Sequence, residues 1–269
     1  MNFVEKLINA TRRNQSLLCI GLDTDPELLP EKMNVFEFNK AIIDATEDLV
    51  CAYKPNLAFY EVQGSDGFES LKNTVDYIPD DVPVIADAKR GDIGNTAQAY
   101  ARALFEHFCF DAATVNPYLG FDAIEPFLKY QEKGVLILCR TSNVSAVDFQ
   151  SLHCQTGNGQ RPLFEIVALK ANQWNANGNI GLVIGATYPE ELNLIRQNYP
   201  DLPLLIPGIG AQGGDLEITV RYGVDSRGEK TIINSSRGII YASRGADFAE
   251  AARQAALALR NQINQYLLR

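Results

Sequence analysis

The chain has 269 residues, of which 46% are hydrophobic and 21% charged, values typical of a globular protein with a sizeable core. Its 33 acidic and 24 basic residues leave a net charge of −9. This charge argues against a nucleic-acid or anionic-membrane partner, because such polyanions are bound mainly by clustered Lys and Arg. No apolar run approaches the roughly 20 residues of a bilayer-spanning helix, and the N-terminus does not have the pattern of a signal peptide.

The five cysteines are scattered along the chain, odd in number and never arranged as C-x-x-C. Cys19, Cys51 and Cys139 lie within apolar runs, where a cysteine behaves as a small core residue. We therefore expect a cytoplasmic protein without disulfides.

An amphipathic helix is expected over residues 2–14. It is followed by eight short apolar runs without alternation, the pattern of strands that are buried on both faces. These predicted strands cover residues 16–23, 50–54, 82–87, 112–116, 134–139, 180–185, 203–206 and 231–234.

Helical patterns follow the predicted strands, at residues 35–47, 68–77, 94–107, 121–132, 162–174, 188–198, 214–222 and 246–267. Strand–helix alternation repeated eight times predicts a (β/α)8 TIM barrel with an extra N-terminal helix. No linker or low-complexity tract divides the chain, so we expect one domain over residues 1–269. A doubly wound open sheet is the structural alternative.

One connection is unusually long, from Arg140 to Arg161, and it is rich in Ser, Asn, Gln and Gly. A loop of this length in a compact domain is usually functional or flexible. Because it follows the fifth strand, we expect it on the C-terminal face of the barrel, where such enzymes carry their active sites.

Charged residues end three successive predicted strands. Asp23 ends the first and Lys54 the second, while Asp87 and Lys89 end the third and, two apart, project to the same side of an extended strand. The resulting acid–base alternation in a partly desolvated cleft would stabilise each charged form. A structural ion-pair network is the alternative, although buried ion pairs are a poor source of stability.

A second set of residues fits a phosphate group. The glycine-rich run 207–214 follows the seventh strand and offers backbone N–H groups, and Arg237 after the eighth strand supplies a forked cation. Loops after the seventh and eighth strands form the recurrent phosphate site of these barrels. We therefore predict a phosphate-bearing substrate.

Several other functions are not supported by the sequence. His107 lies on a predicted helix and His153 in the long loop, and without a cluster of Cys and His residues a zinc site is improbable. No G-x-S-x-G motif occurs, and no G-x-G-x-x-G opens the first helix, so neither a serine hydrolase nor a dinucleotide cofactor is indicated. Tyr53, Phe59 and Tyr60 are interpreted as packing residues.

The segment Asp87-Ala88-Lys89-Arg90-Gly91-Asp92-Ile93-Gly94-Asn95-Thr96 resembles the D-x-K-x-x-D-I-x-x-T core of the orotidine 5′-phosphate decarboxylase family. That motif is highly specific, and shorter matches extend along the whole chain. They are Gly21-Leu22-Asp23, Tyr53-Lys54-Pro55-Asn56, Asn116-Pro117-Tyr118-Leu119-Gly120, Thr141-Ser142-Asn143, the run 207–214 and Ser236-Arg237-Gly238. The chain length and the long fifth connection resemble the longer bacterial branch of this family.

The resemblance implies cofactor-free and metal-free decarboxylation of orotidine 5′-phosphate to uridine 5′-phosphate and CO2, in the last step of pyrimidine nucleotide synthesis. Lys89 would protonate C6 of the pyrimidine, Asp87 would lie near the substrate carboxylate, and Lys54 would complete the charged array. The remaining roles implied are ribose binding for Asp23, the pyrimidine edge for Ser142, phosphate binding for Gln212 and Arg237, and donation across a homodimer interface for Asp92 and Thr96.

Two rival functions remain. A sugar-phosphate aldolase or decarboxylase could share the barrel and the D-x-K-x-x-D core while using magnesium; Thr96, the Asn116-Pro117-Tyr118 segment and the Gln212/Arg237 pair favour the nucleotide enzyme. A catalytically silent phosphate-binding protein would keep the glycine-rich loop and Arg237 but would not need the charged array.

Overall fold

The computed structural model describes residues 1–31, 33–157, 159–209 and 214–267. Its main sheet has eight parallel strands in the order β2-β1-β10-β9-β8-β5-β4-β3. Bridges from Tyr53 to Val84 and from Asn56 to Asp87 join β2 to β3 and close the sheet into a barrel. The strands are β1 (Leu18–Gly21), β2 (Ala52–Lys54), β3 (Ile85–Arg90), β4 (Ala112–Val115), β5 (Gly134–Arg140), β8 (Ile180–Ile184), β9 (Leu204–Ile206) and β10 (Thr231–Ser235). The predicted (β/α)8 barrel is confirmed, and the open-sheet alternative is wrong.

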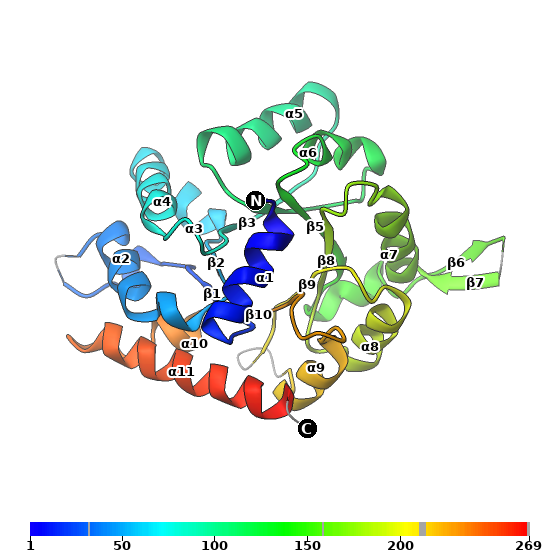
Figure 1. Cartoon of the computed structure of the whole chain (residues 1–269). Helices are drawn as coiled ribbons and strands as arrows, with labels where there is room; N and C mark the ends of the chain where they lie inside the picture. Colours follow the sequence, from blue (N-terminus) through cyan, green and yellow to red (C-terminus); the bar gives the residue numbers. More distant parts are fainter. Residues whose placement is uncertain (32, 158, 210–213, 268–269) are drawn as a thin grey trace.

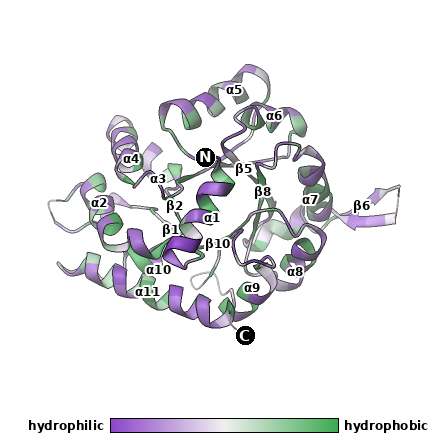
Figure 2. Ribbon diagram, viewed as in Figure 1, coloured by the Kyte–Doolittle hydropathy of each residue, from purple (hydrophilic) through white to green (hydrophobic). Residues whose placement is uncertain are grey.

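Helices surround the barrel, as Figure 1 shows. In Figure 2 their outer edges are largely hydrophilic, and green hydrophobic residues gather on the strands and on the helix faces turned toward them. This arrangement buries the apolar stripe of each helix against the sheet. The helices are α1 (Phe3–Asn14), α2 (Val35–Thr46), α3 (Leu57–Glu61), α4 (Ser65–Tyr77), α5 (Gly94–Arg102), α6 (Glu125–Leu128), α7 (Leu163–Trp174), α8 (Pro189–Asn198), α9 (Leu216–Gly223), α10 (Arg237–Ile240) and α11 (Phe248–Leu267).

The extra N-terminal helix α1 lies across one end of the barrel (Figure 1). A capping box starts it, in which the Asn2 side chain accepts from the Glu5 N–H and the Glu5 carboxylate accepts from the Asn2 N–H. Phe3 and Leu7 enter the apolar interior of the barrel. A Cβ on Gly134 would lie 2.3 Å from the Phe3 ring, so only glycine permits this approach. The helix therefore closes the N-terminal end of the barrel.

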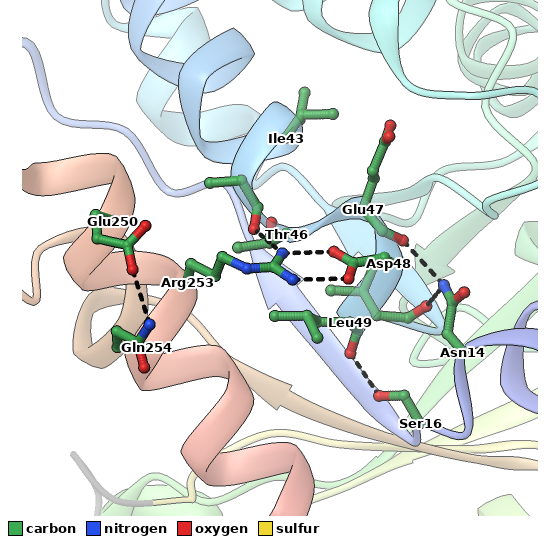
Figure 3. A network of polar contacts seen from close by, with 12 residues as sticks. Asn14, Ser16, Ile43, Thr46, Glu47, Asp48, Leu49, Glu250, Arg253 and Gln254 are labelled. Carbon is green, nitrogen blue, oxygen red and sulfur yellow. Dashed lines mark hydrogen bonds and ion pairs between the residues drawn. The ribbon is translucent and has the colours of Figure 1, made fainter.

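The last helix, α11, is fixed to the start of the barrel by polar contacts (Figure 3). Arg253 donates to both carboxylate oxygens of Asp48, at 2.6 and 2.9 Å, and to the backbone oxygen of Ala45 at 2.7 Å. From the other side, Asn14 and Ser16 donate to backbone oxygens of the same segment. The end of the chain is thus joined to the loop that precedes β2.

The long connection after β5 is not the unstructured loop that its composition suggests. It contains a 3-10 helix over Val144–Asp148 and an antiparallel hairpin of β6 (His153–Thr156) and β7 (Gly159–Pro162). The hairpin projects away from the barrel (Figure 1) and is hydrophilic (Figure 2). Apolar alternation could not reveal these strands, because they have no apolar face to bury.

Smaller differences concern element boundaries. α3 was not predicted, the helix predicted over 94–107 changes to a π-helical turn at Ala103–His107, and only Glu125–Leu128 of the helix predicted over 121–132 is α-helical. Cys19, Cys51, Cys139, Tyr53 and Tyr60 are buried in the core, and Phe59 packs against it, which confirms their interpretation as packing residues. Within the described part of the chain, no helix is both long enough and apolar enough to cross a bilayer.

Candidate active site

A cavity of about 610 Å³ opens where the barrel strands end. Polar and charged side chains form one part of its wall, and apolar side chains form another. Its lining residues are Asp23, Lys54, Asn56, Asp87, Lys89, Thr114, Leu138, Thr141, Ser142, Asn143, Gln150, Val183, Leu205, Pro207, Gly208, Ile209, Asn234, Ser235, Ser236, Arg237 and Gly238. The site therefore lies at the C-terminal face of the barrel, as predicted from the strand ends.

The carboxylate of Asp87 joins the two lysines. One oxygen lies 2.9 Å from Lys54 Nζ and the other lies 2.6 Å from Lys89 Nζ. The side chain of Lys54 is only 4% exposed and that of Asp87 12%, whereas Lys89 is 50% exposed. Lys54 is thus a fixed buried charge, and Lys89 is the ammonium that reaches into the cavity.

Burial would raise the pKa of Asp87, but the ammonium groups of Lys54 and Lys89 outweigh it and hold that pKa well below its usual range. Burial likewise lowers the pKa of Lys54, while the charges of Asp87 and Asp23 raise it to a net value above normal. At neutral pH both groups are ionised. The buried thiol of Cys19 beneath them has its pKa raised to about 12 by burial, so it stays neutral.

The backbone at Lys89 departs from the regular strand that the sequence suggested. Its φ angle is +46°, and the pairing of β3 with β4 shifts register between Ala86 and Arg90. Asp87 and Lys89 do share one side, but the contact is made through this irregularity rather than by simple strand alternation. The buried Thr114 supports it, because its hydroxyl accepts from the Lys89 N–H at 2.9 Å and lies 3.1 Å from Asp87 Oδ1 as a donor.

Asp23 and Asn234 bring hydrogen-bonding atoms to the cavity that no described residue satisfies. The buried atoms Asp23 Oδ1 and Asn234 Oδ1 have no partner among the described residues. A buried acceptor without a donor costs about 1–3 kcal/mol. Both residues line the cavity, so these two acceptors belong to the candidate site.

Two of the three residues predicted to bind the phosphate and the pyrimidine, Arg237 and Ser142, line the cavity. Arg237 begins α10 and lies exposed on the cavity wall with Pro207 and Gly208, and Ser142 lies on the wall after β5. Gln212 lies outside the described residues, so its contacts are not described.

Asp92 and Thr96 are not brought into this cavity. Thr96 is exposed on α5, and the partly exposed carboxylate of Asp92 accepts the N–H of Ile93 at 2.8 Å. The apolar side chain of the adjacent Ile93 is open to solvent, 54% exposed. The D-x-K-x-x-D run is therefore divided between the cavity and an outer surface.

Sequence reasoning missed several cavity residues: Thr114, Leu138, Gln150, Val183 and Leu205. Thr114 lies one residue before the end of β4 and faces the interior, a position that strand alternation could have indicated. The three apolar residues read as ordinary core in the sequence. No cluster of three His, Cys, Asp or Glu side chains suited to a metal ion occurs within the described ranges.

Comparisons with known proteins agree with this arrangement. Residues 16–255 match the model of the orotidine 5′-phosphate decarboxylase / HUMPS family. The chain is 54% identical over 266 residues to an orotidine 5′-phosphate decarboxylase of Dehalococcoides mccartyi, covering 99% of this chain and 98% of the relative. A relative of that name from Ralstonia pickettii is 50% identical over 275 residues, covering 99% of each chain.

Solved structures are similar as well. An OMP decarboxylase of Leishmania donovani is 40% identical, with a TM-score of 0.87 and full coverage of both chains. A structure from Toxoplasma gondii, described as a putative orotidine-monophosphate-decarboxylase, gives a TM-score of 0.90 at 40% identity, covering 98% of this chain and 96% of that one.

Proposed function

This chain belongs to the orotidine 5′-phosphate decarboxylase family and is a carboxy-lyase of pyrimidine nucleotide synthesis, and from this premise we propose that it works without metal ion or cofactor, with Lys89 protonating C6. The bond between C6 and the carboxylate breaks, CO2 leaves, and the electron pair remains on C6. The proton that replaces CO2 comes from the Lys89 ammonium. The observation that carries this proposal is the Lys54–Asp87–Lys89 array in the cavity.

The Lys89 ammonium stabilises the negative charge that develops on C6. Its ammonium is already held by Asp87 at 2.6 Å, so it needs little reorganisation when the charge appears. The half-exposed side chain can recover a proton from water after each turnover. Lys54 is buried on the opposite oxygen of Asp87 and keeps that carboxylate fixed.

Asp87 would face the carboxylate of the substrate. Its depressed pKa keeps it charged at neutral pH, so binding brings two negative groups together. Binding energy from the phosphate, remote from the reacting carbon, can offset this cost, and the repulsion is relieved as CO2 leaves. The apolar wall of Leu138, Val183 and Leu205 offers surroundings suited to a neutral CO2 molecule.

The remaining groups fit the rest of the nucleotide. Asp23 Oδ1 lacks a donor among the described residues, which suits a ribose hydroxyl. Arg237, with Gln212, would bind the phosphate, and Ser142 would contact the edge of the pyrimidine. Thr96 and Asp92 would complete the site of a second subunit.

The proposed working unit is a homodimer in which each subunit lends Asp92 and Thr96 to its partner. Neither residue is among those that line their own chain's cavity, and Ile93 beside Asp92 is exposed. Mixing inactive Asp92→Ala and Lys89→Ala subunits tests this, because one site of each hybrid dimer would contain both native residues. Random pairing should restore about one quarter of wild-type activity; absence of any recovery would count against cross-subunit donation.

The primary test follows the loss of orotidine 5′-phosphate absorbance with purified protein and excess chelator. Undiminished turnover supports the metal-free reaction. Turnover that stops with chelator and returns with magnesium favours the magnesium-dependent rival. Binding of the nucleotide without turnover favours a catalytically silent binding protein.

A further inference from the structure

Beyond Thr141, Ser142 and Asn143, the long connection after β5 also brings Gln150 to the cavity wall. We propose that Gln150 is a positioning residue that fixes the Thr141–Ser142 turn on the base side of the site and thereby sets the enzyme's preference for a pyrimidine nucleotide. The inference rests on the proposed function, in which Ser142 contacts the pyrimidine. It also gives the inserted segment a role that its composition did not reveal.

Gln150 binds Thr141 with both ends of its amide. Its Oε1 accepts the Thr141 N–H at 2.8 Å, and its Nε2 donates to Thr141 Oγ1 at 2.8 Å. The Thr141 hydroxyl lies 2.6 Å from Asn143 Oδ1 and donates to it. The Gln150 side chain thus fixes the position of Thr141, and the Thr141 hydroxyl extends the contact to Asn143.

Gln150 is itself held on both sides. Its backbone N–H donates to the Ala146 carbonyl at 2.9 Å, and its own carbonyl accepts the N–H of Phe164 at 3.0 Å. Arg140 Nη1 lies 3.3 Å from Gln150 Oε1 as a donor. Because the backbone is fixed to the 3-10 helix and to α7, the amide cannot follow Thr141 if the turn moves.

Arg140, which donates to Gln150, is itself held by partners in the next βα unit. Its side chain is 1% exposed, it pairs with Glu191, and its guanidinium lies 3.6 Å from the centre of the Tyr188 ring. These partners belong to the β8–α8 region. A buried cation that lies outside the cavity thereby connects the loop after β5 with the next βα unit.

The loop after β8 also confines the turn. A Cβ on Gly185 would lie 2.7 Å from both the backbone nitrogen and the Cβ of Ser142, so the loop after β8 touches Ser142 closely. Thr187 Oγ1 donates to the Ser142 carbonyl at 3.4 Å. Ser142 therefore contacts the loop after β8, and the preceding residue, Thr141, is held by Gln150, which leaves Ser142 little freedom to change direction.

The experiment compares inhibition by uridine 5′-phosphate, which has a base, and by ribose 5-phosphate, which has none. Gln150→Met keeps the length of the side chain but removes its hydrogen bonds. It should raise the inhibition constant of uridine 5′-phosphate roughly tenfold, which is the effect of losing one or two hydrogen bonds. The inhibition constant of ribose 5-phosphate should not change. Gln150→Glu retains an acceptor for the Thr141 N–H and for Arg140. It should therefore keep most of the preference for uridine 5′-phosphate over ribose 5-phosphate.

Gln197→Met is the matched control, because this exposed glutamine on α8 bonds only to Asn193 among the described residues. It should leave both inhibition constants unchanged. If Gln150→Met does not fold, Thr141→Val removes the hydroxyl half of the same contact and should reduce the base preference a few-fold.

An unchanged ratio of the two inhibition constants in Gln150→Met, or in Thr141→Val, would overturn the inference. Equal weakening of both inhibitors would also overturn it, because that result means general loosening of the site. Failure of the wild-type protein to turn over orotidine 5′-phosphate would instead contradict the proposed function.

Discussion

At their N-terminal end the barrel strands bury uncharged side chains, among them Ile85 and Ala112, which pack in one cluster with Phe3 and Leu7 of α1. At their C-terminal end they bury charged side chains, where Lys54 and Asp87 face the cavity. The first end is an apolar cluster closed from water. At the second end, charges are buried and two acceptors have no donor among the described residues. Even a paired buried charge adds little net stability, because the cost of removing both charges from water offsets their attraction. The comparison indicates that the apolar end stabilises the fold and so permits an unfavourable arrangement at the reactive end.

The largest effect is expected at the reactive end. Lys89→Ala removes the proposed proton donor, which is also the ammonium proposed to stabilise the developing charge, so kcat should fall by more than about 10⁴-fold. Because Lys89 is half exposed, the thermal midpoint and the circular dichroism spectrum should change little. A rate near that of the wild type would contradict the mechanism.

The opposite outcome is expected at the closed end. Phe3→Ala should lower the free energy of unfolding by about 3–5 kcal/mol, because the ring is 2% exposed and leaves a cavity. The kcat per folded molecule, measured after denaturant titration, should remain that of the wild type. Phe149→Ala is the control, since this 61%-exposed ring should contribute less than about 1 kcal/mol.

The stability contributed by the charged end should depend on pH, whereas that of the apolar end should not. The pKa of Asp87 is lower in the folded than in the unfolded protein, so its stabilising contribution is complete above about pH 4 and is lost as pH falls below that value. Asp87→Asn leaves Lys54 buried without its partner and should cost about 3 kcal/mol at pH 7. Denaturant titrations at pH 7 and pH 3 should give a smaller difference from the wild type at pH 3; an equal difference would argue against this linkage.

The smallest effect is expected at the rim. Arg237→Ala should raise KM roughly 10- to 100-fold, because a charge-assisted contact to a phosphate is worth about 1.5–3 kcal/mol. Steady-state kinetics with orotidine 5′-phosphate measure it, and Arg227→Ala on the surface turn before β10 is the control. An unchanged KM for Arg237→Ala would mean that the phosphate binds elsewhere.

Much of this protein could be predicted from the sequence because its signals are local. Eight apolar runs separated by helical patterns determine a barrel, and parallel strands bring their C-terminal residues to one face. Asp23, Lys54, Asp87, Lys89, Ser142 and Arg237 could therefore be grouped from strand ends and motifs alone, and all six line the cavity. The D-x-K-x-x-D-I-x-x-T run, together with the shorter matches along the chain, indicated the family.

Only the tertiary structure decided how these residues meet. The left-handed backbone at Lys89 and its support by Thr114 depend on the register of β3 against β4, which no local pattern encodes. The apolar wall and the contact of Gln150 with Thr141 join residues that no periodicity links. The exclusion of Asp92 from the cavity depends on the turn after β3. Local periodicity thus determines the elements, whereas contacts between elements depend on packing that the whole chain decides together.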